Sequence, residues 1–136
     1  MGVAALATAA TADDSQVLPR TPSPEGASAY IIAPADGSIV SSPVSVRFGL
    51  VGMGVAPAGV LNAKTGHHHL IIDAPTPRAG APIPKDSNHR HFGGGQTEVS
   101  VELEPGSHTL QLVLGDHIHV PHDPPVASET ITITVE

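Results

Sequence analysis

The chain has 136 residues, a length that fits one domain, and contains no cysteine, which excludes disulfides, cysteine-zinc sites and the thiolate-ligated blue-copper centre. Its formal net charge is −7 and its six Lys and Arg residues are scattered, so it has no basic patch for nucleic acid. Gly and Pro number 14 each and aromatic residues are scarce, which favours short strands and turns around a core of Val, Ile and Leu.

Two segments precede the predicted domain. Residues 1–12 form a short apolar run ending in Ala-Thr-Ala, which has the form of a signal-peptide cleavage site and predicts a periplasmic or secreted protein. The basic segment of a full signal is missing, so an unstructured alanine-rich leader is the alternative. Residues 13–28 are polar and proline-rich, and predict a flexible linker. No stretch reaches the roughly 18–20 apolar residues of a membrane span.

Residues 29–136 predict a single all-β domain, an immunoglobulin-like or cupredoxin-like antiparallel sandwich of about seven strands. The alternation of apolar and polar residues is clear after Pro43, where Val44, Val46 and Phe48 are separated by Ser45 and Arg47. Further strands are expected at 30–32, 67–73, 97–103, 108–114 and 129–135. The loop between the strands at 67–73 and 97–103 has about twenty residues, a length that is usually functional.

Eight of the nine histidines fall into three groups along the chain. The groups are His67, His68 and His69; His89 and His91; and His117, His119 and His122. Each group contains an H-x-H pair, and on extended chain both rings of such a pair point to one face. Imidazole nitrogens bind copper, zinc, nickel and iron(II), in sites of three or four protein ligands. The eight histidines are therefore predicted metal ligands; a pH-sensitive histidine-rich surface is the competing interpretation.

The expected strand order brings the three groups to one end of the sandwich. A short turn joins strands 97–103 and 108–114, which are expected to form an antiparallel hairpin, so the second and third groups share the end opposite the turn. The strand 67–73 is expected to run antiparallel to 108–114, which brings the first group and Met53 to that same end. His108 lies at the turn and is expected to be structural.

Eight histidines exceed one coordination shell, so either some of them orient the ligands or there are two metal ions. His68 has the parity of Leu70 and Ile72, so it is either a ligand or a residue that points between the sheets. Three aspartates near the groups are candidates to orient ring N–H groups: Asp73, Asp116 and Asp123.

The motifs GHHHLIID, HRHFGGGQTE, PGSHTLQLVLGDHIHVPHDPP and SETITITV occur in this order between Tyr30 and Val135. In these motifs the chain resembles an uncharacterised family of small secreted bacterial proteins, described as a domain of unknown function. The resemblance implies an exported β-sandwich whose motifs carry the eight histidines, and it implies no activity. A broader similarity to cupredoxin-like and periplasmic copper-chaperone sandwiches is one of architecture alone.

These features predict an exported protein that stores, buffers or delivers copper, with a metal-donor or metal-acceptor protein as its partner. All-histidine sites bind both copper and zinc, and the Irving–Williams order favours copper, for which Met53 would be a soft ligand in the Cu(I) state. The alternative is a copper- or zinc-dependent metalloenzyme. No catalytic residue can be named, and Asp13 at the predicted mature terminus does not supply the histidine of a histidine brace. An adhesion module is disfavoured because aromatic residues are scarce.

Overall fold

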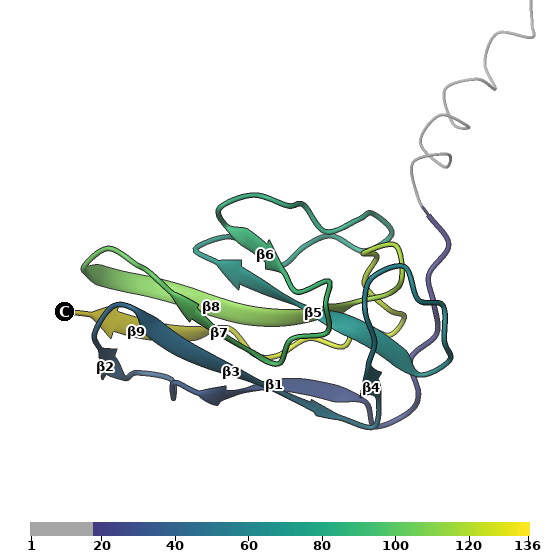
Figure 1. The fold of residues 1–136 in the computed structure, drawn as a ribbon, viewed down its shortest axis with the longest axis horizontal. Helices are drawn as coiled ribbons and strands as arrows, with labels where there is room; N and C mark the ends of the chain where they lie inside the picture. Colours follow the sequence, from purple (N-terminus) through teal and green to yellow (C-terminus); the bar gives the residue numbers. More distant parts are fainter. Residues whose placement is uncertain (1–17) are drawn as a thin grey trace, which may run out of the picture.

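The computed structural model describes residues 18–136, which form two packed β-sheets (Figure 1). The predicted all-β single domain is confirmed, with nine strands instead of about seven. The predicted signal remnant, residues 1–12, lies outside the described residues. Within residues 18–136 there is no helix long and apolar enough to cross a membrane.

The smaller sheet has three antiparallel strands in the order β1-β3-β7: β1 (Ser28–Ala33), β3 (Val44–Val51) and β7 (Glu98–Val101). In β3 the side chains of Val44, Val46 and Phe48 are buried, while those of Ser45 and Arg47 are exposed. The period-2 pattern in the sequence therefore marks the face that this sheet turns toward the core.

The larger sheet contains six strands: β2 (Ile39–Val40), β9 (Ile131–Val135), β8 (Gly106–Gly115), β5 (Thr65–Ile72), β4 (Gly54–Val55) and β6 (His89–His91). Strand β8 pairs antiparallel with both β5 and β9, which confirms the expected pairing of 67–73 with 108–114. The two short strands β4 and β6 both pair with β5 along the edge away from β8. β5 is therefore an inner strand of its sheet.

The predicted hairpin of 97–103 with 108–114 is wrong, because β7 and β8 belong to different sheets. Both strands bury apolar side chains, Val101 on β7 and Leu110 on β8, in the core between the sheets. The turn at 102–105 thus crosses from one sheet to the other. With β1, β3 and β7 in one sheet and β5, β8 and β9 in the other, the strands follow the A-B-E and C-F-G division of immunoglobulin-like sandwiches.

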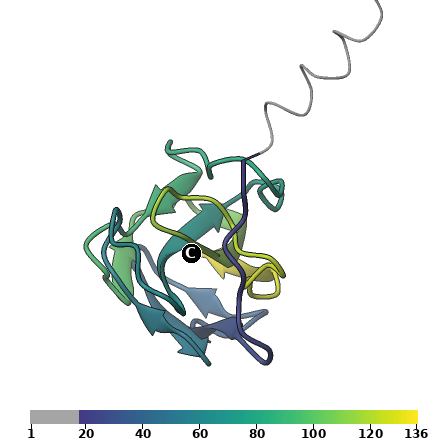
Figure 2. The same cartoon turned by 90° about the vertical axis from the view of Figure 1, so that its right-hand side faces the viewer.

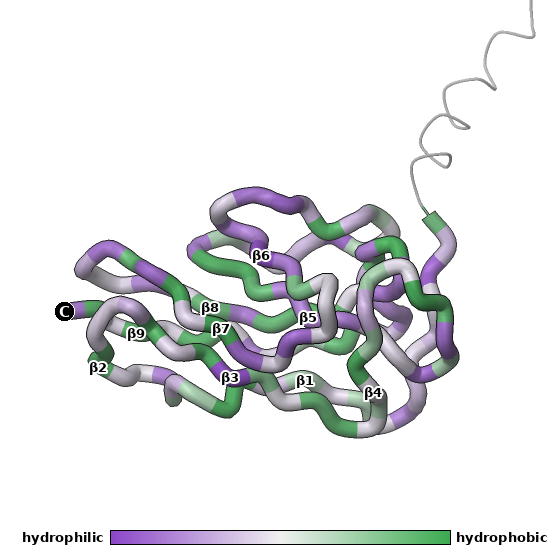
Figure 3. The backbone as a smooth tube through the Cα atoms, viewed as in Figure 1, coloured by the Kyte–Doolittle hydropathy of each residue, from purple (hydrophilic) through white to green (hydrophobic). Residues whose placement is uncertain are grey.

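The main core lies between the sheets and a second, smaller core lies outside the larger sheet. The main core includes Val46, Leu70, Leu112 and Ile133. The smaller core consists of Ile71, Ile83 and Val113 with two alanines packed against them, and Ile83 comes from the long loop 73–88. Figure 3 shows hydrophobic and hydrophilic residues interspersed along the strands. Strand β5 is consequently covered on both faces, by the other sheet and by this loop.

Residues 18–24, in the segment expected to be a flexible linker, lie against the loop that follows β8 (Figure 2). We call these residues the N-terminal strap. Ser23 N donates to Asp123 O at 3.0 Å, and Asp123 N donates to Thr21 O at 3.0 Å. At the start of the strap, Leu18 N donates to Gly80 O at 2.7 Å. The described part of the linker is therefore fastened to the domain by backbone hydrogen bonds.

His68 lies in the main core. Its ring centroid is 5.1 Å from that of Phe48, and within residues 18–136 neither of its buried ring nitrogens has a hydrogen-bond partner. Burial lowers the pKa of His68 to about 4, so the ring is neutral at pH 7.

We expect His68→Leu to leave the free energy of unfolding unchanged or to raise it by about 1 kcal/mol. Leucine is apolar and of similar size, and it removes two unpaired polar atoms from the core. Urea denaturation of both proteins with a chelator present measures the difference. A loss above about 2 kcal/mol would mean that these ring nitrogens make stabilising contacts.

Candidate metal centre

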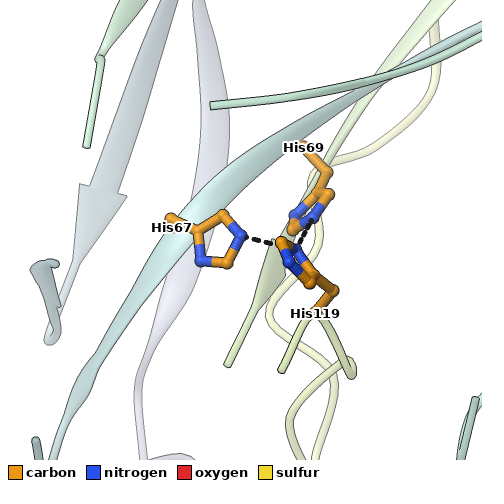
Figure 4. A group of neighbouring side chains, drawn as sticks. All are labelled: His67, His69 and His119. Atoms are coloured by element: carbon orange, nitrogen blue, oxygen red, sulfur yellow. Dashed lines mark hydrogen bonds between the residues drawn. The ribbon is translucent and has the colours of Figure 1, made fainter. Parts of the chain in front are cut away.

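Three histidine rings meet on the outer face of the larger sheet (Figure 4). His67 and His69 come from β5, and His119 comes from the loop after β8. His119 Nδ1 lies 3.0 Å from His67 Nε2 and 3.3 Å from His69 Nε2. One ring nitrogen from each residue lies within 4.8 Å of those of the other two. We call these three residues the histidine cluster.

The alternation of side chains along β5 sends consecutive histidines to opposite faces. Leu70 and Ile72 belong to the core between the sheets, whereas Ile71 belongs to the smaller core outside the larger sheet. His67 and His69 share the parity of Ile71, and their rings are fully buried beneath the loops on the outer face. The H-x-H spacing therefore places both rings on one side of the sheet, as expected.

A glycine on β8 makes room for the ring of His69. Gly115 lies opposite His67 in the strand register. A Cβ atom on Gly115 would lie 2.5 Å from Cε1 and 3.0 Å from Nδ1 of His69. Gly115 was not among the residues expected to form the site. The sequence feature that could have identified it is the position of this glycine directly after a strand of alternating apolar residues. A glycine in such a position often marks the close approach of another group to the backbone.

His91 lies at the edge of the histidine cluster. Its β6 position is directly opposite His69 in the antiparallel register. The centroid of its ring is 4.8 Å from that of His119, 5.9 Å from that of His69 and 6.2 Å from that of His67. Each of the three predicted histidine groups thus contributes at least one ring here, and His91 is the candidate for a fourth ligand.

The separations between ring nitrogens fit a transition-metal ion. Metal–nitrogen bonds of about 2.0–2.1 Å in a tetrahedral site place two ligand nitrogens about 3.3 Å apart, close to the two distances between His119 and its neighbours. The buried Nδ1 atoms of His67 and His69 have no hydrogen-bond partner in the described part of the chain. The atoms that would bind the ion are instead His67 Nε2, His69 Nε2 and His119 Nδ1, which point toward one another.

The rings of the cluster on β5 are uncharged at neutral pH. Burial, followed by the nearby rings of His119 and His91, lowers the pKa of His67 to about 4. Burial, followed by the ring of His67, lowers the pKa of His69 to about 3. Because a metal binds neutral imidazole, both rings are in the protonation state that a metal ligand requires.

The backbone of the loop after β8 turns His119 toward the sheet. His119 has a φ of 67°, in the left-handed region that residues other than glycine seldom adopt. The buried carboxylate of Asp116 holds this loop, since its Oδ1 accepts hydrogen bonds from Ile118 N at 2.9 Å and Val120 N at 3.0 Å. The backbone of His119 is held on both sides, because its N donates to Asp116 O and its O accepts from Ile83 N.

The structure does not bring the other four predicted ligands into the cluster: His68, His89, His117 and His122. His68 lies on the opposite face of β5, in the core. His89 Nδ1 is 2.7 Å from Asp86 Oδ1, and His117 is half-buried in the loop after β8. His122 is fully buried, and its Cε1 lies 2.9 Å from where a Cβ on Gly66 would be.

In residues 18–136, none of the three aspartates expected to orient ring N–H groups is hydrogen-bonded to a ring of the histidine cluster. Asp73 Oδ2 is 2.6 Å from Nδ1 of His108, the histidine expected to be structural, and that ring also donates to Glu104 O. Asp123 pairs with Arg20 at 3.6 Å. The Asp116 carboxylate accepts hydrogen bonds from Thr21 Oγ1 and from two backbone N–H groups of the loop after β8, and so fixes the position of this loop. Met53 packs against the main core.

Fold and site together define a β-sandwich domain that carries a buried histidine cluster, a candidate metal centre, on the outer face of one sheet. The chain belongs to the family described as Domain of unknown function (DUF4399), whose model matches residues 46–136. This range includes the whole histidine cluster and His91, and begins after the N-terminal strap. No curated protein and no solved structure matches the chain.

Gly115→Ala should weaken metal binding by about tenfold or more, because the new methyl group must displace the ring of His69. Gly54→Ala is the matched control, since a Cβ there would contact only a side-chain carbon of Thr65 at 3.7 Å. Metal titration of both variants and the wild type measures the effect. Equal affinities for Gly115→Ala and the wild type would show that the position of this ring does not matter for binding.

Acidification should destabilise the metal-free protein. The folded-state pKa values are about 4 for His67 and His68 and about 3 for His69, below the ordinary value of 6.5. Between about pH 4 and pH 6.5 the unfolded chain therefore binds more protons than the folded chain does. The contribution of these three histidines to stability is complete above pH 6.5 and is lost as the pH falls toward 4. The hydrogen bond to Asp73 raises the pKa of His108, so this one residue changes the stability in the opposite direction as the pH falls.

Urea denaturation at pH 7.5 and pH 4.5 with a chelator should show a free energy of unfolding lower by at least about 2 kcal/mol at the acidic pH. His68→Leu should reduce the difference, because one of the histidines with a lowered pKa is then absent. A free energy of unfolding that is constant or higher at pH 4.5 would contradict the burial of these rings in the neutral form.

Proposed function

We propose that this chain is an exported metal-binding protein that holds copper at the histidine cluster and stores, buffers or delivers it. The observation that carries the proposal is the convergence of His67, His69 and His119, whose ring nitrogens lie at the spacing of metal ligands. The two rings on β5 are neutral at physiological pH, which supports the same conclusion.

The donor set favours copper over zinc. The site offers imidazole nitrogens and the chain contains no thiolate, so the ligands are of a type that both metals accept. In open competition for such ligands, the Irving–Williams order favours Cu(II). His67, His69 and His119 would hold the ion and His91 would supply a fourth nitrogen. Bound copper would give the site a one-electron couple, whereas zinc would be redox-inert.

The placement of the cluster suits exchange of a metal with a partner protein. His67 and His69 are fully buried on β5, whereas His91 and His119 are half-buried and thus accessible from the solvent side. The ion would be held by the sheet on the side of His67 and His69, and a partner protein would reach it from the side of His91 and His119. Export is proposed from the Ala-Thr-Ala pattern at residues 10–12 and the absence of cysteine, and fractionation of the native host would test it.

A metalloenzyme is the second candidate. The observation in its favour is a cavity of about 450 Å³ lined by Lys85, Asp86, His89, Arg90, His91 and Phe92, which adjoins the cluster at His91. A small substrate bound in this cavity would approach the ion from the side of His91. Turnover of a substrate by the metal-loaded protein would favour this candidate, whereas stoichiometric transfer of copper to a chelator or acceptor protein would favour delivery.

The sharpest test of the metal site replaces each of two adjacent histidines, one at a time, with leucine. We expect His69→Leu to lower the affinity for Cu(II) by about 100-fold or more, because it removes a nitrogen of the cluster. His68→Leu, one residue away on the opposite face of β5, should retain the wild-type affinity. His119→Leu should behave like His69→Leu, and His108→Ala like the wild type. Titration against a competing chelator measures the affinities, and electron paramagnetic resonance should show nitrogen ligands.

An untagged wild-type protein that binds neither Cu(II) nor Zn(II) tightly would refute the proposal. Equal losses in His68→Leu and His69→Leu would show that the outer-face cluster is not the site. Stoichiometric zinc retained against excess copper would leave the site intact and change its metal.

A further inference from the structure

The N-terminal strap is bonded to the same carboxylate that shapes the loop of His119. Thr21 Oγ1 donates a hydrogen bond to Asp116 Oδ2 at 2.8 Å. The other oxygen of this carboxylate, Oδ1, accepts from the backbone N–H groups of Ile118 and Val120, the two neighbours of His119. Asp116 is only 2 % exposed, so these contacts are shielded from water. Thr21 is therefore two hydrogen bonds away from the peptide units that flank His119.

A second set of contacts fastens the strap to the far end of the same loop. The Arg20 guanidinium donates to the carbonyl oxygens of Pro121 and His122 and pairs with the carboxylate of Asp123 at 3.6 Å. Backbone hydrogen bonds join Asp123 to Thr21 and Ser23. Figure 2 shows the strap running alongside this loop. The loop segment 116–123 is thus held to the strap at both of its ends.

The strap also contacts the other loop that holds His119. Leu18 N donates to Gly80 O, in the loop between β5 and β6. Three residues later in that loop, Ile83 N donates to His119 O at 2.8 Å. Both loops that fix the backbone of His119 are therefore bonded to residues of the strap.

We propose that the N-terminal strap positions His119 for metal binding, with Thr21 and Asp116 as positioning residues, and that a bound metal in turn tightens the strap. This inference rests on the proposed function. His67 and His69 are fixed by the ladder of β5, whereas His119 has a left-handed backbone conformation that its surroundings must maintain. Coupling between two sites is reciprocal, so a strap that favours metal binding must itself be stabilised by the metal.

The strap lies outside the region that the family model matches, which begins at residue 46. An opening of the strap would free the Asp116 carboxylate and loosen the loop of His119, while leaving His67 and His69 in place. The strap would thereby set the affinity of the site without contributing a ligand to it.

The first experiment compares Thr21→Val, Thr21→Ser and Ser42→Ala in the full chain. Valine keeps the shape of threonine and removes the hydroxyl, so Thr21→Val should bind Cu(II) about tenfold more weakly than the wild type. Thr21→Ser retains the hydroxyl and should restore the affinity. Ser42→Ala is the control, because it removes a hydroxyl that accepts a hydrogen bond from Leu103 N at 3.0 Å, and Ser42 lies between β2 and β3, outside the strap and both loops that hold His119. The Cu(II) paramagnetic resonance spectrum should change in Thr21→Val alone, since a nitrogen ligand has moved.

The second experiment measures hydrogen exchange of the wild-type chain with and without Zn(II), a redox-silent probe. The amides of Ser23 and Asp123, which join strap and loop, should exchange at least about tenfold more slowly in the presence of the metal. In Thr21→Val this protection should be smaller at the same degree of metal saturation.

The outcomes separate the two proposals. A wild-type chain that binds neither metal overturns the metal site and, with it, the coupling. A wild-type chain that binds metal, together with unchanged affinity and spectrum in Thr21→Val and no added protection of the strap, overturns the coupling alone. Equal losses in Thr21→Val and Ser42→Ala would also overturn it, because they would reflect general destabilisation.

Discussion

The structure depends on the central position of β5, which is buried on both faces and paired along both edges. Three consecutive histidines on a strand must point to alternate faces, so a strand with one solvent-facing side would expose either His68 or the pair His67 and His69. Here β8 on one edge and β4 and β6 on the other satisfy the backbone of β5, and the second sheet and the outer loops cover its faces. Burial of all three rings follows from this placement, and burial is what keeps them neutral.

Buried rings with unpaired nitrogens oppose folding, and the surrounding apolar core must offset them. The leucines of β8 and the valines of β3 provide that core on the inner face, where His68 packs against Phe48. On the outer face the apolar core is small, with Ile71, Ile83 and Val113 at its centre. The histidine cluster lies beside this weaker core, where a cation bound by His67 Nε2, His69 Nε2 and His119 Nδ1 would add to the stability of the folded chain.

Much of the fold and the location of the site could be predicted from sequence, because strand alternation and H-x-H spacing are local properties. The parity of His67 and His69 follows from them, and the immunoglobulin-like strand order gave the pairing of 67–73 with 108–114. The second histidine group was expected to join through the hairpin, which is wrong, and His91 reaches the site because β6 pairs with β5. No local pattern records the crossing of the turn after β7, but the immunoglobulin-like division of strands implies it, because that division places β7 and β8 in different sheets. The roles of Gly115 and Thr21 depend on contacts between distant segments, which no local pattern records.

The candidate site therefore has two halves that differ in how they are held. The rings on β5 are placed by the hydrogen bonds of an inner strand, whose opening requires disruption of the sheet. His119 is placed by a loop whose order depends on one buried carboxylate and on contacts with two other loop segments. Loop contacts of this kind open at lower free energy than an inner strand does. A metal held between the two halves would enter and leave on the side of His119, while His67 and His69 keep their positions, so the rate of exchange would be set by the loop and not by the sheet.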